Sequence, residues 1–258
     1  MLRALWTAAS GMSAQQLNVD TISNNLANVN TTGFKRQRVD YQDLFYQTLR
    51  EPGTEVGSPN GLEVGMGAYP VATQKIFTGG ELQRTDTPLD MAIEGSGFFQ
   101  VGLADGTTAY GRAGTFRLDQ DGKIVTPDGY PIQPEITVPA DAQEIVINTN
   151  GKVSVRVTGA ALPTEIGTIE LASFSNPAGL RSLGHSLYAE SPSSGTPVTG
   201  TAGLDGMGQI RQGMLEGSNV SVVDEMVGMI TAQRAYELSA KAIQTADDMI
   251  RISNNLRG

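Results

Sequence analysis

The C-terminal segment VVDEMVGMITAQRAYELSAKAIQTADDMIRISNNL (residues 222–256) carries an apolar side chain at every seventh position. The repeated positions are Val222, Met229, Tyr236, Ile243 and Ile250, with Met226 and Ala240 as companions. Sustained seven-residue spacing indicates a helix that packs along its length in a coiled-coil manner. We expect this helix within residues 217–258, with Asn219 or Ser221 as N-cap and two acidic residues in the first turn. The alternative is one amphipathic helix lying on its own globular core.

The N-terminal segment has the same spacing. Its repeated positions are Leu5, Met12, Val19 and Leu26, with Ala8, Ile22 and Val29 as companions. Arg3 and Asp20 are the only charges in the first 32 residues, whereas an ordinary surface helix carries many more. Small uncharged polar side chains permit close neighbours on several sides, which favours packing within an assembly. The helix is expected within residues 1–33, because Gly33 suits the left-handed turn that ends a helix.

The middle of the chain is expected to consist of β-hairpins. Residues 91–94, 98–101, 144–147, 152–157 and 168–171 read as strands. Tight turns are predicted at five Asp-Gly or Asn-Gly pairs, at residues 105–106, 121–122, 128–129, 150–151 and 205–206. Prolines between residues 131 and 139, and the Asn-Pro-Ala-Gly stretch at 176–179, suggest that residues 140–180 form an inserted small β domain.

The predicted fold class is therefore α+β. Long N- and C-terminal helices with coiled-coil-like pairing flank a mainly antiparallel β core that holds an inserted small β domain. The predicted divisions are an N-terminal helix at 1–33, an extended linker or hairpin at 34–67, a β core at 68–139 and 181–216, the inserted domain at 140–180, and a C-terminal helix at 217–258.

Composition argues against several classes of function. The chain of 258 residues has a net charge of -9, no cysteine and one histidine. Residues 51–212 hold 9 Lys+Arg against 18 Asp+Glu, and such an acidic middle disfavours nucleic acid or anionic lipid as a partner. No apolar run approaches the length of a membrane span, and no secretory signal peptide is recognisable. The usual His/Cys metal clusters, a Cys-His nucleophile pair and a P-loop are all missing, so we expect no enzyme, metal or cofactor.

Three stretches resemble bacterial flagellar rod and hook proteins. These stretches are SNNLANVNTTGFK (residues 23–35), PLDMAIEGSGFFQ (88–100) and residues 219–256, which contain MITAQRAY (229–236), so the resemblance covers nearly the whole chain. The signature positions are Ser23, Asn24, Asn25, Leu26, Ala27, Asn28, Gly33 and Phe34. The overall length and the segment YQTLREPGTEVGSPNGLEVGMG (46–67) look most like the distal rod members of that family.

The resemblance implies a mechanical function without catalysis. Terminal helices would pair and stack in concentric tubes around an export channel, with β domains pointing outward. The chain would be delivered by the flagellar type III export apparatus without a cleaved signal. It would polymerise with itself into a drive shaft in the periplasm, between proximal rod proteins and hook protein, and turn within the P and L rings. The pentapeptide ISNNL, present at residues 22–26 and 252–256, would serve both helices in similar crowded surroundings.

The segment of residues 46–67 is the predicted stiffening element. It contains two prolines and an Asn-Gly turn signal, so it cannot be one continuous helix. It also carries apolar side chains that would be costly to leave in water, and the residues that we assign to bracing against neighbouring subunits are Tyr46, Leu49, Pro52, Leu62, Val64 and Met66. Alternatives for the whole chain are a soluble adhesion or binding module with terminal coiled-coil helices and, more remotely, a cell-wall hydrolase with an acidic cleft.

Overall fold

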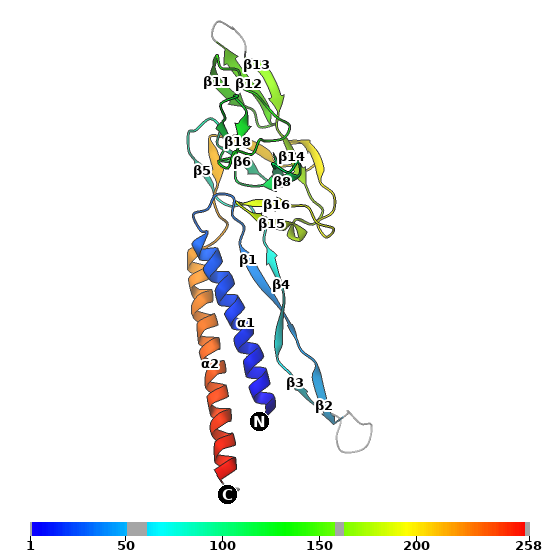
Figure 1. Ribbon diagram of the computed structural model, residues 1–258, viewed down its shortest axis with the longest axis vertical. Helices are drawn as coiled ribbons and strands as arrows, with labels where there is room; N and C mark the ends of the chain where they lie inside the picture. Colours follow the sequence, from blue (N-terminus) through cyan, green and yellow to red (C-terminus); the bar gives the residue numbers. More distant parts are fainter. Residues whose placement is uncertain (1, 51–60, 158–162, 256–258) are drawn as a thin grey trace. The chain divides into compact units, whose positions relative to one another are not determined.

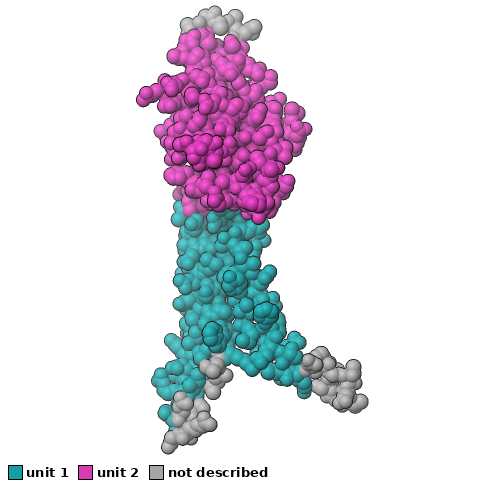
Figure 2. All heavy atoms as spheres, turned by 45° about the vertical axis from the view of Figure 1, so that its right-hand side comes forward, with its two compact units in different colours: residues 1–27, 37–75, 221–258 teal, residues 28–36, 76–220 magenta. Residues whose placement is uncertain are grey.

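A computed structural model describes residues 2–50, 61–157 and 163–255. The chain divides into two compact units, shown in different colours in Figure 2. Unit 1 consists of residues 1–27, 37–75 and 221–258, and unit 2 of residues 28–36 and 76–220. The terminal helices therefore belong to one unit and the β-rich middle to the other.

Unit 1 is built on two antiparallel helices. Helix α1 spans Leu2–Ala27 and helix α2 spans Val222–Asn255, and the two lie side by side in Figure 1. Helix α1 ends at Ala27, six residues before the predicted end at Gly33, whereas α2 begins at Val222, directly after Ser221, one of its two predicted N-caps. Asp224 and Glu225 occupy the first turn of α2 as expected. Seven-residue apolar spacing thus predicts both helices correctly, and the end that is predicted wrongly is that of α1.

A long antiparallel ribbon completes unit 1. Strand β1 (Gln37–Asp43) pairs with β4 (Ala68–Lys75), and β2 (Tyr46–Arg50) pairs with β3 (Leu62–Gly65). The ribbon contacts α1. Tyr41 donates its hydroxyl hydrogen to the Ala14 carbonyl oxygen over 3.2 Å. Gly67 has φ of +116°, and a Cβ there would stand 2.1 Å from the Ser10 hydroxyl oxygen, so glycine permits this close approach of ribbon to helix.

Unit 2 contains the remaining strands in several antiparallel sheets. Its largest sheet has six strands in the order β15-β16-β8-β7-β14-β17, and β11, β12 and β13 form a three-stranded sheet. Smaller pairs join β10 to β9, β18 to β6 and β19 to β5. The elements are β5 (Leu82–Arg84), β6 (Met91–Glu94), β7 (Phe98–Gly102), β8 (Thr108–Gly111), β9 (Arg117–Leu118), β10 (Ile124–Val125), β11 (Ala142–Ile147), β12 (Lys152–Val157), β13 (Thr164–Thr168), β14 (Glu170–Ser173), the 3-10 turn η1 (Pro177–Gly179), β15 (Arg181–Gly184), β16 (Leu187–Ala189), β17 (Val198–Thr201), β18 (Gln209–Gln212) and β19 (Met214–Glu216).

Four of the five expected strands coincide with observed ones, and one does not. Residues 168–171 fall on the junction between β13, which ends at Thr168, and β14, which begins at Glu170. These two strands belong to different sheets. Residues 168–171 are therefore not one strand, because the chain passes from one sheet to the next within them. All five predicted turns hold a glycine with positive φ, between 74° and 87°.

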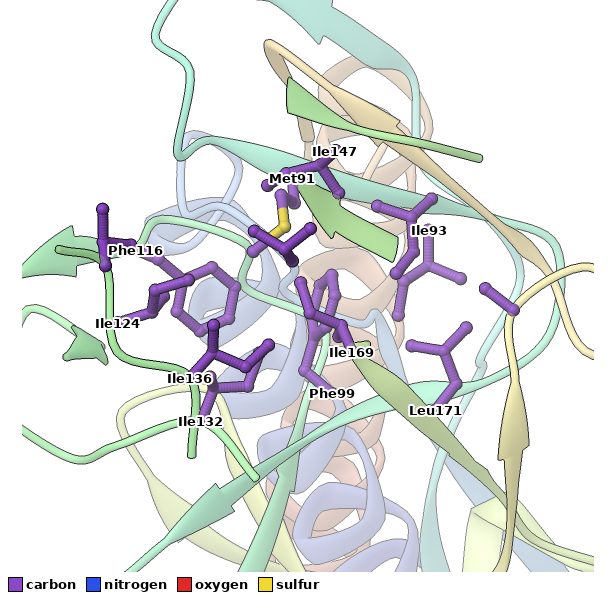
Figure 3. Close-up of a cluster of buried hydrophobic side chains, with 14 of the residues drawn as sticks. Met91, Ile93, Phe99, Phe116, Ile124, Ile132, Ile136, Ile147, Ile169 and Leu171 are labelled. Carbon is purple, nitrogen blue, oxygen red and sulfur yellow. The ribbon is translucent and has the colours of Figure 1, made fainter. Parts of the chain in front are cut away.

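One hydrophobic cluster unites most of unit 2. Figure 3 shows side chains of this cluster, among them Met91 of β6 and Phe99 of β7 together with Ile136 and Ile169 from segments between strands. Ile147 of β11 and Val153 and Val155 of β12 belong to the same cluster. The three-stranded sheet of residues 142–168 therefore shares the core of unit 2, and a separately packed inserted domain is not confirmed. A second cluster is aromatic, with the rings of Phe98 and Phe174 edge-to-face at 5.7 Å.

Candidate functional site

The signature stretch of residues 23–35 contributes one fully buried amide to unit 1. Asn25 is 1% exposed, and its side chain bonds the backbone of β1 twice: it donates to the Gln37 carbonyl oxygen over 2.8 Å and accepts from the Gln37 N–H over 2.9 Å. It also donates to the Glu225 carboxylate of α2 over 3.2 Å. One asparagine thus ties α1, β1 and α2 together, while its neighbours Ser23 and Asn24 are exposed.

The second half of the signature lies in unit 2 and needs glycine at one position. Gly33 has φ of +68°, and its N–H donates to the Glu216 carbonyl oxygen over 2.8 Å. A Cβ at Gly33 would stand 2.5 Å from the Ala113 backbone nitrogen. The predicted left-handed conformation is therefore confirmed. Its role differs from the predicted helix cap, because Gly33 fits a loop against the β domain six residues beyond the end of α1.

Lys35 ends the signature in a buried cluster of charges. Its ammonium group is fully buried and donates to the Glu216 carboxylate over 2.6 Å and to the Thr78 carbonyl oxygen over 2.7 Å. The same carboxylate accepts from the Gly80 N–H over 2.9 Å and from Arg112 over 3.4 Å. Two cations therefore share one buried carboxylate. Burial lowers the pKa of Lys35 below its usual value, and the neighbouring Glu216 opposes this shift.

Arg112 and Tyr188 form the rim of that cluster. The Arg112 guanidinium, 3% exposed, donates to the Gly95 carbonyl oxygen over 2.9 Å and lies 5.3 Å from the centre of the Phe98 ring. Burial lowers the pKa of Arg112 and raises the pKa of Tyr188 to about 12. Arg112 contacts a carboxylate, a carbonyl oxygen and an aromatic ring, so its role is to hold these segments of unit 2 together. These residues are far apart in the sequence, so the sequence alone did not predict the cluster.

The two candidate N-caps of α2 have separate roles. Ser221 is the cap, because its hydroxyl oxygen accepts from the Asp224 N–H over 3.4 Å at the first turn. Asn219 belongs to unit 2, where its amide donates to the Ile76 carbonyl oxygen over 2.8 Å and accepts from the Arg36 N–H over 2.7 Å. The side chain of Asn219 thus joins three segments of unit 2 that are distant in sequence.

The contact between α1 and α2 uses smaller residues than the apolar repeat suggested. A Cβ added at Gly11 would meet the Ser239 hydroxyl at 3.5 Å, and one at Gly228 would meet Ile22 at 3.4 Å. On α2, the seven-residue line of positions 225, 232, 239 and 246 holds Glu225, Ala232, Ser239 and Ala246, of which all but Ser239 are buried. Sequence reasoning missed this line because it followed large apolar side chains, whereas closely approaching helices need small ones.

The predicted helix-packing residues fall into three groups. Ile22 is buried. The exposed group is Val222, Met226 and Tyr236. The half-buried group is Leu5, Met12, Val19, Leu26, Met229, Ile243 and Ile250, together with Val29, which lies beyond the end of α1. The apolar repeat is thus only partly used inside one chain, and its role in packing between chains stays a prediction.

Unit 1 exposes most of the large apolar side chains of the described residues. Of the 21 that are exposed, 17 lie in unit 1, although unit 2 has more residues. On the helices they are Trp6, Val222, Val223, Met226, Val227, Ile230, Tyr236, Leu238, Met249 and Ile252, and on the ribbon Tyr41, Phe45, Tyr46, Leu49, Leu62, Tyr69 and Val71. Exposed apolar surface on this scale marks a site of protein contact.

The stiffening residues lie on the ribbon where the structure describes them. Tyr46, Leu49 and Leu62 are exposed, and Val64 and Met66 are half-buried. Pro52 lies outside the described residues. The described helices include none that is long and apolar enough to cross a membrane. No cluster of three metal-binding side chains occurs among the residues that the structure covers.

Three family models match the chain. The "Flagella basal body rod protein" model matches residues 5–35, the "Flagellar hook protein FlgE/F/G D1 domain" model residues 92–155, and the "Flagellar basal body rod FlgEFG protein C-terminal" model residues 211–256. These matches fall on α1 with the signature loop, on the β core and on α2. They place the chain in the class of flagellar rod and hook proteins.

Full-length relatives narrow the class further. The chain is 51% identical to the flagellar basal-body rod protein FlgG of Borreliella burgdorferi, covering 100% of this chain and 99% of that protein. It is 47% identical to FlgG of Agrobacterium fabrum (99% and 100% covered) and 39% identical to FlgG of Bacillus subtilis (100% of both). The chain therefore belongs to the family of flagellar basal-body rod proteins FlgG. A solved flagellar hook protein FlgE2 of Helicobacter pylori is 16% identical over 70% of this chain and 43% of that one, but a TM-score of 0.24 makes this likeness too weak for an argument.

Proposed function

We propose that this chain is a structural subunit of the flagellar distal rod, a self-assembling tubular shaft that transmits motor torque across the periplasm to the hook. The concentration of exposed apolar side chains on unit 1 carries the proposal, because helices with such surfaces are completed by neighbouring chains. Family membership supplies the biological setting. The chain acts by holding its neighbours and catalyses no reaction.

The proposal includes partners and location. The principal partner is the same chain, repeated in a helical homopolymer. Proximal rod proteins and hook protein lie at the two ends of that polymer, and the P and L rings surround it. The flagellar type III export apparatus delivers the chain without a cleaved signal peptide, and the subunit is not inserted into the membrane. The family of the relatives supports this setting.

Electron microscopy of the purified full-length chain tests polymerisation. We expect straight fibres, and we expect Met226→Asp to abolish them, because a charge on an apolar contact surface is costly to desolvate. Leu204→Asp is the matched control, since Leu204 of unit 2 is 58% exposed and Met226 is 53% exposed. A chain that stays monomeric at high concentration, or equal effects of the two substitutions, would count against the proposal.

We also propose that the segment of residues 46–67 braces neighbouring subunits and keeps the shaft straight. Tyr46, Leu49 and Leu62 are each about half exposed, at 57%, 49% and 51%, on the paired strands β2 and β3. Contact of these side chains with an adjacent chain is favourable by about 25 cal/mol of free energy per Å² of apolar surface removed from water. Deleting residues 52–65 should leave polymers that are curved or compliant. Polymers as straight and stiff as those of the parent would refute the bracing role.

A further inference from the structure

Trp6 is an isolated aromatic side chain near the start of α1. It is the only tryptophan of the chain and is 71% exposed. An aromatic side chain of this kind buries about 150–250 Å² when it packs, and tryptophan is among the residues that most often dominate binding interfaces. On the same face of α1, one and two turns further on, stand the small exposed residues Ala9 and Ser13. Small side chains at these two positions leave room for a close neighbour.

A cavity of about 370 Å³ opens on the helix pair of unit 1. Its walls are Gln16 and Val19 of α1 and Gln233, Tyr236 and Glu237 of α2. An engineered cavity of about 150 Å³ already admits benzene, so this one has room for an indole ring. The walls combine an aliphatic side chain and a phenol ring with two amide oxygens and a carboxylate. Such walls suit an indole, because it is apolar apart from one N–H donor, which any of these oxygens can accept.

Trp6 cannot enter the cavity of its own chain. Ten residues separate Trp6 from Gln16 along α1, which is about 15 Å at the helical rise of 1.5 Å per residue. Residues 6, 9, 13 and 16 follow the spacing of one helix face, so Trp6 and the rim of the cavity face the same side of the helix. A second copy with parallel helices, turned about the helix axis so that its cavity faces the first copy and displaced along the axis by about that distance, would bring the two together.

We propose that Trp6 of one chain docks into the cavity between α1 and α2 of a second copy of this chain. This inference rests on the proposed polymerising function and specifies one contact between neighbouring subunits. Trp6 and the cavity are two different patches of the chain, so the contact joins unlike surfaces and is heterologous. Repeating such a contact does not close into a dimer but extends into an open helical array.

Fluorescence tests the contact directly, because Trp6 is the only source of tryptophan emission. We expect the emission of the full-length chain to shift to the blue and to resist quenching by acrylamide at the concentration at which fibres appear. Trp6→Ala should raise the critical concentration for polymerisation by about 30-fold, the scale of an interface hot spot. Trp6→Phe should recover part of that loss.

Two complementary variants separate docking from folding and from polymerisation. Gln233→Phe fills the cavity and keeps Trp6, whereas Trp6→Ala keeps the cavity and has no tryptophan. Gln233→Ala leaves the cavity open and is the matched control. We expect the emission of the Gln233→Phe chain to stay red alone and to shift to the blue when the Trp6→Ala chain is added.

Each outcome decides between the two proposals. No shift in this mixture would overturn the docking of Trp6. Fibres of the parent chain in which Trp6 stays fully open to acrylamide would overturn the docking and leave the rod function standing. A blue shift in small oligomers without fibres would support the docking and contradict the polymer.

Discussion

Replacing Glu216 by glutamine removes the only negative charge that the described cluster of Lys35 and Arg112 contains. The three side chains are 1%, 0% and 3% exposed, and Glu216 accepts hydrogen bonds of 2.6 Å from Lys35 and 2.9 Å from the Gly80 N–H. Glutamine has nearly the same shape and keeps one acceptor oxygen, so the change is almost purely electrostatic. Breaking a buried ion pair by removing one partner costs about 3–5 kcal/mol, and we expect Glu216→Gln to lower the free energy of unfolding of unit 2 by this amount.

The loss should depend on pH in a defined direction. Burial already lowers the pKa of Lys35, and without Glu216 nothing in the cluster opposes that shift. Between the lowered folded pKa and the unfolded value of 10.5, the unfolded chain binds more protons than the folded chain. Unfolding free energy therefore rises with pH across this window. The Glu216→Gln variant should recover part of its lost stability as the pH rises toward the unfolded pKa of 10.5, because Lys35 can release its proton whereas Arg112 cannot.

Hydrogen exchange resolved by residue is the suitable assay, because Trp6 lies in unit 1 and its fluorescence would not report on unit 2. Protection of the amides of β7 in urea gives the free energy of opening. Glu94→Gln is the matched control: it removes a carboxylate from the exposed pair with Arg211, 2.7 Å apart, which should cost less than about 1 kcal/mol. Equal losses in the two variants, or a loss for Glu216→Gln that does not change with pH, would refute the reasoning.

Three further changes test other parts of the structure. Asn25→Ala should destabilise unit 1 by about 1–3 kcal/mol, because it removes both hydrogen bonds that the buried Asn25 side chain makes to the half-buried Gln37 backbone; loss of exchange protection at the Gln37 amide is the readout. Ile243→Asp should weaken polymerisation by several-fold more than Gln244→Asp, since Ile243 is half-buried and Gln244 exposed; equal critical concentrations would contradict the helix register. The pKa of Tyr188 is raised to about 12, so the folded chain keeps this proton at pH values where an unfolded tyrosine loses it. Between about pH 9 and pH 11, the free energy of unfolding of the parent should therefore fall by about 1.3 kcal/mol relative to that of Tyr188→Phe.

Local patterns in the sequence predicted the local features of the fold. Apolar residues at seven-residue spacing identified both helices, and Asp-Gly and Asn-Gly pairs identified five turns whose glycines all have positive φ. Gly33 was correctly assigned a left-handed conformation. These features depend on a few neighbouring residues, whose preferences can be read directly.

Features that join distant segments could not be predicted. Lys35 meets Glu216 across 181 positions and Asn25 meets Glu225 across 200, and no local pattern marks such pairs. The contact line on α2 was missed for a different reason, since Ala232 and Ala246 are buried because they are small. A search for large apolar residues identifies surfaces that stay exposed in a single chain as readily as surfaces that are buried within it.

The repeated pentapeptide ISNNL shows this difference within one chain. Ile22 of the first copy is 7% exposed and Asn25 is 1% exposed, whereas Ile252 of the second copy is 60% exposed and Asn255 is exposed as well. Leu256 lies outside the described residues. The similar surroundings expected for the two copies are therefore absent within the single chain, as far as the structure describes it, and a neighbouring chain would have to supply them.

This contrast leads to a prediction for two chemically identical substitutions. Ile22→Ala removes a buried side chain and should destabilise unit 1 by about 2–5 kcal/mol. Ile252→Ala changes an exposed position and should alter the unfolding of the isolated chain by less than about 0.5 kcal/mol, yet it should raise the critical concentration for fibres at least several-fold. Thermal unfolding of the monomer and sedimentation of the polymer separate the two effects. If Ile252→Ala polymerises like the parent, the second copy of ISNNL has no role between chains, and the pentapeptide repeats by coincidence.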